Sequence, residues 1–211
     1  MIKRQQSLIL LLSLLWFFSV NALGDASSVL NHQLQQYQGL SGRFQQTLVD
    51  DQGSIIQESS GEFVLKRPGY LRWRTEDPFP QLLVSNLENI WLYDPDLEQV
   101  TIRSYQKTAD QTPSLLLSGN TEKIVEKYQI EFANQSSEQS PQFILTPKFK
   151  GSSFSQLQLI FSEGLLSEMI LLDSLGQTTT FRFFELTVNP PIEIEQFTFE
   201  PPAGVDVLVD D

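Results

Sequence analysis

The 211-residue sequence contains no cysteine and a single histidine, His32. Without cysteine the chain forms no disulfide bonds and offers no thiol for lipid attachment, so we expect a secreted protein that is released rather than anchored. One histidine without cysteine does not make the usual zinc site or a Cys–His nucleophile pair. A G-x-S-x-G motif is also missing. We therefore expect no metal, no cofactor and no catalytic residue.

Basic residues are scarce, with 14 Lys and Arg against 26 Asp and Glu. The first 24 residues hold two of the basic residues and none of the acidic ones, which leaves 12 against 26 and a net charge of −14 for residues 25–211. Such a surface repels nucleic acid and anionic lipid head groups, so nucleic-acid binding is not expected. A carboxylate pair of the glycosidase kind is an alternative, but acidic pairs such as Asp50–Asp51 lie in expected turns, where carboxylates are usually solvated.

The longest apolar run lies near the amino terminus. Two basic residues precede a nearly unbroken apolar stretch from Ser7 to Val20, which is the layout of a secretory signal peptide. The stretch is shorter than the roughly 20 residues that a membrane-spanning helix needs, although an uncleaved anchor is the alternative. We expect residues 1–24 to be removed, with cleavage after Gly24 or Ala22. Residues 25–211 would then form a single domain in the periplasm.

Hydrophobic periodicity predicts a mostly β chain with three short helices. Apolar residues recur at helical spacing over Val29–Tyr37, and Gly39 ends the pattern. The period then changes to two, in a meander of strands joined by turns such as Asp50–Gly53. Two short helices at 112–119 and 121–128 interrupt the meander. Strands resume at Tyr128–Ala133, Gln142–Thr146, Leu157–Phe161, Leu165–Leu172, Thr178–Val188 and Gln196–Phe199.

This order of elements favours a curled sheet with a helical cover. A sheet of so many strands curls, and helices too short to form a layer of their own most naturally cover its concave side. Trp73, Trp91, Phe181, Phe183 and the leucines at 115–117 are more large apolar side chains than a thin curled sheet needs for itself. The sequence therefore favours a binding cavity over a catalytic cleft.

Several segments, taken in order, resemble a known family. They are Lys66–Trp73, Leu82–Ser85, Trp91–Pro95, Leu97–Thr101, the Thr112-Pro113 pair with its leucines, Asp173–Thr178 and Phe197–Val205. Their order and spacing resemble the outer-membrane lipoprotein carrier family, LolA, over nearly all of residues 25–211.

The resemblance implies an unclosed antiparallel β-barrel with an α-helical lid. It also implies a periplasmic carrier, without enzymatic activity, that hides the acyl chains of lipoproteins in its cavity. Such a carrier receives lipoproteins from an ABC transporter in the inner membrane and delivers them to a receptor in the outer membrane, and it is a monomer. A periplasmic lipid or lipoprotein sensor of the same fold is the alternative.

The resemblance also assigns site residues. Arg67 matches the family's latch arginine, which donates hydrogen bonds to the lid backbone when the cavity is empty. Leu71 lies at a cavity position where many members have phenylalanine. The full set that we expect to line the acyl-chain cavity is Leu34, Leu71, Trp73, Leu83, Trp91, Leu115, Leu117, Phe181 and Phe183.

Overall fold

The computed structural model describes residues 25–108, 117–119 and 121–210. The expected signal peptide at 1–24 and most of the expected helix at 112–119 lie outside these ranges. The strands are β1 (Gly39–Val49), β2 (Ile55–Lys66), β3 (Tyr70–Asp77), β4 (Gln81–Ser85), β5 (Asn89–Asp94), β6 (Gln99–Ser104), β7 (Tyr128–Phe132), β8 (Gln142–Pro147), β9 (Phe154–Ser162), β10 (Leu165–Asp173), β11 (Thr178–Val188) and β12 (Asp206–Asp210). The helices are α1 (Ala26–Gln35), α2 (Tyr105–Thr108), α4 (Thr121–Lys127) and the 3-10 helix η2 (Ile194–Phe197).

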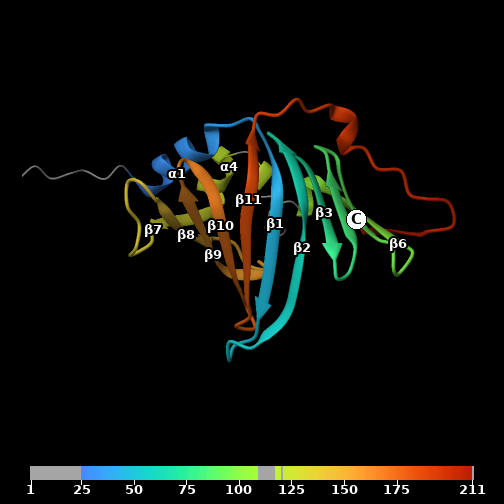
Figure 1. The fold of residues 1–211 in the computed structure, drawn as a ribbon, viewed down its shortest axis with the longest axis horizontal. Coiled ribbons are helices and arrows are strands. Elements are labelled where there is room, and N and C mark those ends of the chain that lie inside the picture. Colours follow the sequence, from blue (N-terminus) through green and yellow to red (C-terminus); the bar gives the residue numbers. More distant parts are fainter. Residues whose placement is uncertain (1–24, 109–116, 120, 211) are drawn as a thin grey trace, which may run out of the picture.

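All the described strands belong to one curled sheet (Figure 1). Its order is β12-β6-β5-β4-β3-β2-β1-β11-β10-β9-β8-β7, so β1 joins the two halves by pairing with both β2 and β11. Neighbouring strands are antiparallel except for β12, which runs parallel to β6. Since β12 and β7 stand at opposite ends of this order, the barrel is unclosed. The predicted fold class is confirmed, with β12 as the one parallel strand.

The ladder between β2 and β3 is irregular near the middle of β2. The register of β2 against β3 shifts between Ser60 and Gly61, and such irregularities increase local twist. A Cβ atom at Gly61 would collide with the carbonyl oxygen of Arg74 on β3 and lie 2.8 Å from the ring of Phe44 on β1. Glycine at position 61 therefore lets β3 approach β2 closely and leaves space for the Phe44 ring beside it.

Short helices cover one end of the concave face. Leu30 and Leu34 of α1 are each 1% exposed, and Ile124 of α4 packs into the same apolar core. Both helices lie near the upper end of the sheet in Figure 1, while the β1–β2 and β10–β11 turns lie at the lower end. The sheet therefore has a covered end and an uncovered end.

Within the described ranges, no helix combines the length and apolarity needed to cross a membrane.

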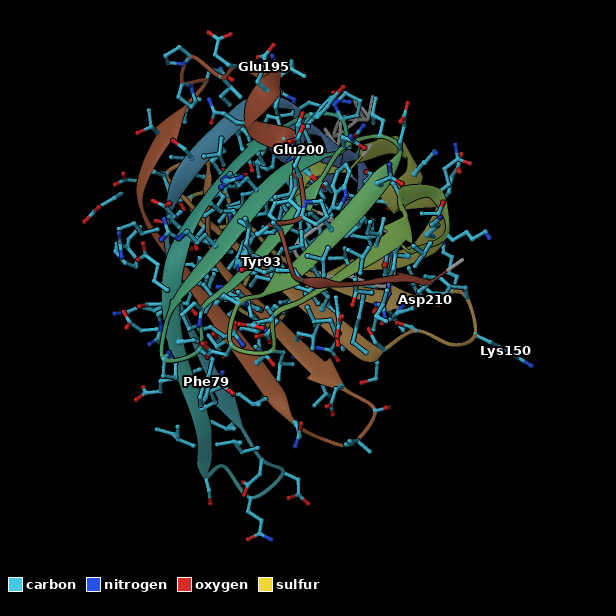
Figure 2. All side chains as sticks on the ribbon, turned by 90° about the vertical axis from the view of Figure 1, so that its right-hand side faces the viewer. Phe79, Tyr93, Lys150, Glu195, Glu200 and Asp210 are labelled. Atoms are coloured by element: carbon cyan, nitrogen blue, oxygen red, sulfur yellow. The ribbon has the colours of Figure 1, made fainter. Side chains whose placement is uncertain are left out.

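The carboxy-terminal segment packs on the outer face of the sheet. Phe197 of η2 is 1% exposed and lies 5.4 Å from the Tyr70 ring, while Phe199 lies 5.5 Å from the ring of Tyr93, measured between centroids. In Figure 2 the segment runs down past Glu200 and across the strands to Asp210. The expected strand at Gln196–Phe199 is wrong, because η2 and an extended stretch occupy this region and the strand begins only at Asp206. The apolar residues of this stretch, Phe197 and Phe199, pack on the outer face of the sheet and do not belong to a strand.

Candidate functional site

An aromatic layer lies on the concave face where the two halves of the sheet meet. The Trp73 ring of β3 stacks on Phe44 of β1, with centroids 4.1 Å apart. Phe181 and Phe183 of β11 meet Trp73 edge-on at centroid distances of 5.6 and 6.1 Å. Because β1 pairs with both β2 and β11, it brings rings that are far apart in the sequence onto one surface. Trp73, Phe181 and Phe183 of the predicted set therefore lie together.

The end of this layer nearest the helices is closed by side chains. Leu34 of α1, Leu71 of β3 and Leu117 of the segment 117–119 are at most 3% exposed and belong to the same core cluster. Leu34, Leu71 and Leu117 of the predicted set therefore lie together in the apolar core beneath the helical cover, shielded from solvent.

A pocket of about 290 Å³ lies on the concave face at the uncovered end of the aromatic layer. Trp73, Leu83 and Phe181 of the predicted set line it. Two further apolar side chains, Leu92 of β5 and Leu171 of β10, complete its apolar floor. The remaining lining residues are neutral and polar, namely Gln46, Thr75, Gln81 and Thr179.

Trp91 does not line this pocket, and its assignment to the cavity is wrong. Leu83 pairs with Leu92 in the ladder between β4 and β5, so the neighbouring Trp91 lies on the opposite face. Tyr93, on the same face as Trp91, packs against Phe199 of the outer segment. The size of the Trp91 ring suggested a cavity residue, and counting in twos from Leu83 also reaches Trp91, but the register of the β4–β5 hairpin pairs Leu83 with Leu92 and places Leu92 on the concave face. Leu115 of the predicted set lies outside the described residues.

Arg67 lies in the turn between β2 and β3 and contacts the helical cover. Its Nη1 donates a hydrogen bond to the carbonyl oxygen of Gly119 at 3.2 Å, and its guanidinium carbon lies 5.3 Å from the centre of the Tyr37 ring. The same turn makes a second contact, because the backbone N–H of Gly69 donates to the carbonyl oxygen of Ser118 at 2.6 Å. Two hydrogen bonds therefore fasten residues 118–119 to the sheet, and the family resemblance implied only the first.

The buried Arg67 guanidinium has few hydrogen-bond partners. Its Nε and Nη2 atoms are buried, and no hydrogen-bond acceptor among the described residues meets them. Burial lowers the pKa of Arg67, an effect that the neighbouring Tyr37 partly opposes, and burial raises the pKa of Tyr37. A guanidinium stays charged even so, and a buried charge without full hydrogen bonding is costly.

The described residues were also compared with the ligand clusters of metal sites. Within the described ranges, no three His, Cys, Asp or Glu side chains come together as ligands for a metal ion. The site consists of an apolar pocket, an aromatic layer and a fastened cover. Its chemistry is that of apolar binding.

Comparison with known proteins agrees with this geometry. The family model described as outer membrane lipoprotein carrier protein LolA matches residues 35–200. The chain belongs to the LolA family. An outer-membrane lipoprotein carrier protein of Azotobacter vinelandii is 44% identical over 202 residues, which cover 95% of this chain and 97% of the relative. The LolA relative of Hahella chejuensis is 40% identical over 205 residues, covering 93% and 98% of the two chains.

Solved structures share the LolA fold at much lower identity. A LolA superfamily protein from Nitrosomonas europaea is 10% identical, with a TM-score of 0.50 over 83% of this chain and 99% of that one. An uncharacterised conserved protein from Thermus thermophilus is also 10% identical, with a TM-score of 0.57 over 88% and 100% of the two chains. These likenesses concern the architecture alone.

Proposed function

We propose that this LolA family member is a carrier that shelters the acyl chains of lipoproteins in transit across the periplasm. The observation that carries the proposal is an apolar pocket, floored by the aromatic layer, next to a helical cover that Arg67 and Gly69 fasten to the sheet. The proposed activity is binding and release, with no bond made or broken.

The pocket beside the aromatic layer is too small for the proposed cargo. Pockets that enclose drug-sized molecules measure about 300–1,000 Å³, and this pocket, at about 290 Å³, lies just below that range. The several long acyl chains of a lipoprotein need more room. In the proposed mechanism, loading lifts the cover, breaks the contacts to Ser118 and Gly119, and opens the space around Leu34, Leu71 and Leu117.

Energetics explain why such a carrier is needed. Burying one methylene group contributes about 0.8 kcal/mol, so exposing several acyl chains to water costs tens of kcal/mol. A carrier must offset much of this cost and still release the cargo. A cavity that collapses onto its own aromatic rings when empty favours release, because closure regains the buried apolar contacts around Trp73.

Location and partners are part of the same proposal. The amino-terminal pattern supports export to the periplasm with removal of residues 1–24. In the family's pathway, an ABC transporter of the inner membrane supplies the lipoprotein and a receptor in the outer membrane accepts it. We assign both exchanges to this protein, acting as a monomer.

Displacement of an apolar dye tests the proposal. The purified protein is loaded with bis-ANS and titrated with a synthetic triacylated lipopeptide. We expect the lipopeptide to displace the dye and the same peptide without acyl chains to leave it bound. The carrier function is refuted if the acylated and unacylated peptides give the same curve.

A further inference from the structure

The pocket beside the aromatic layer is apolar at one end and polar at the other. On four strands, the inward-facing residue two positions further from the helices is neutral and polar: Phe44 is followed by Gln46 on β1, Trp73 by Thr75 on β3, Leu83 by Gln81 on β4 and Phe181 by Thr179 on β11. We call Gln46, Thr75, Gln81 and Thr179 the polar rim. Since all four line the same pocket, the rim surrounds its outer part.

The polar rim has hydrogen-bonding groups to spare. No described residue is a hydrogen-bond partner of the side chains of Gln46, Thr75 or Thr179. Gln81 donates one hydrogen bond, from Nε2 to Oδ2 of Asp94 at 3.1 Å, and its amide oxygen stays available. Polar groups in a partly enclosed pocket favour a ligand that supplies the missing partners.

The pocket also lacks charge. None of its nine lining residues is ionisable at neutral pH. The adjacent cation, Arg182, lies on the opposite face of β11 from Phe181 and pairs with Glu168 at 3.5 Å. A phosphate group needs cationic or multiple strong donors, and the polar rim offers only amide and hydroxyl groups.

We infer that the polar rim binds the neutral ester and amide carbonyls that join acyl chains to the amino-terminal residue of a lipoprotein, and that it favours such cargo over phospholipids. The inference rests on the proposed function. The tails lie on the apolar floor around Trp73 and Leu83, and the carbonyl oxygens accept hydrogen bonds from Gln46 and the threonine hydroxyls. A phospholipid carries similar esters, but its phosphate would enter a neutral rim on a chain of strong negative charge.

Three ligands with identical palmitoyl-length tails test the inference on the unchanged protein. They are a dipalmitoyl-glyceryl-cysteine peptide, its dialkyl ether analogue without ester carbonyls, and dipalmitoyl phosphatidylglycerol, each titrated by dye displacement. We expect the diester peptide to bind about tenfold more tightly than the diether peptide, the ratio that one or two net hydrogen bonds supply. We expect the phospholipid to bind more weakly than the diester peptide.

Variants locate the effect in the rim. Thr179→Val and Gln46→Leu should bring the ratio of diester to diether affinity toward one, because each removes a hydrogen-bond donor that only the ester carbonyls use. Thr180→Val, the same substitution on the outer face of the same strand, should keep the wild-type ratio.

The outcomes separate this inference from the function on which it rests. Equal affinity of the wild-type protein for diester and diether peptides overturns the inference, as does phospholipid binding that equals the diester peptide. Failure of every acylated ligand to bind refutes the carrier function itself. The wild-type ratio decides even if a variant does not fold.

Discussion

The backbone N–H of Gly69 and the Nη1 of Arg67 donate to the carbonyl oxygens of two consecutive residues, Ser118 and Gly119, at 2.6 and 3.2 Å. One turn of the sheet therefore holds the cover by a side chain and by its own backbone. The two contacts differ in kind, because the backbone donor is fixed by the turn whereas the side chain carries a charge. Substitutions in this turn should therefore show which contacts stabilise the closed cover and which stabilise the folded sheet.

Arg67→Leu removes the charged contact and leaves the backbone contact in place. Because two of the three guanidinium nitrogens lack described acceptors, we expect the free energy of unfolding to change by no more than about 1 kcal/mol. Lipopeptide transfer to acceptor liposomes should nevertheless be altered, since the cover loses one of its fasteners. Arg74→Leu is the control, because Arg74 is exposed and reaches Glu62 only at 3.8 Å. A transfer rate equal to that of the wild type would remove Arg67 from the mechanism.

Gly69→Ala should destabilise the fold more than a comparable glycine substitution elsewhere. Gly69 has φ +80°, and a Cβ there would lie 2.6 Å from Cδ2 of Leu87 and 2.9 Å from the Tyr105 hydroxyl oxygen. Gly53 has a similar φ of +85° with nothing within 4 Å, so Gly53→Ala reports the backbone strain alone. That strain costs roughly 1–2 kcal/mol. Urea unfolding should show a larger loss for Gly69→Ala, and equal losses would contradict the crowding.

The sequence predicted most of the sheet because alternation with a period of two is a local signal. Trp73, Phe181 and Phe183 follow that alternation, and each lies on the concave face as expected. The joining of the two halves of the sheet could not be predicted in the same way. The pairing of β1 with β11 joins distant segments, and no turn in the sequence encodes it.

Two errors share a physical cause. Trp91 and Phe197 are large apolar residues that a thin sheet can bury on either face, and the sequence does not show that an outer face is covered. Here the carboxy-terminal segment covers it, so Val84, next to Trp91 across the β4–β5 ladder, is fully buried on that face. The carboxy-terminal segment is held on this face by the pairing of β12 with β6, which joins distant parts of the chain and is not visible in the sequence.

Alkaline pH should weaken the fold through Tyr37. Burial raises the pKa of Tyr37 above its ordinary value of 10.0, so the unfolded chain loses the phenol proton first as pH rises. The contribution of Tyr37 is intact below pH 10 and falls by about 1.4 kcal/mol per pH unit between the unfolded and folded pKa values. Burial lowers the pKa of Arg67, which acts in the opposite direction, but only at a pH nearer the ordinary range of arginine. Urea unfolding up to about pH 11 should show a smaller loss for Tyr37→Phe than for the wild type. Equal slopes would contradict this role of burial.

Phe197→Ala should detach the outer segment. The Phe197 ring is 1% exposed and packs on Tyr70, and truncating a buried phenylalanine costs about 3–5 kcal/mol. Ile194→Ala in the same 3-10 helix is the control, because Ile194 is 43% exposed. Limited proteolysis should cut the Phe197 variant near residues 198–205 while the Ile194 variant resists. Protection of both variants would mean that β12 alone holds the segment.

The opposite placement of Trp73 and Trp91 provides a direct test of where acyl chains bind. Trp73 lines the pocket, whereas Trp91 lies on the outer face. A lipopeptide with brominated acyl chains quenches only indoles in contact with those chains. We therefore expect strong quenching of the Trp91→Phe variant, which retains Trp73, and weak quenching of the Trp73→Phe variant, which retains Trp91. Both variants keep an aromatic ring, and urea unfolding should establish that each is folded before quenching is measured. Quenching of Trp91 instead would place the acyl chains on the outer face and would contradict the concave cavity as the binding site.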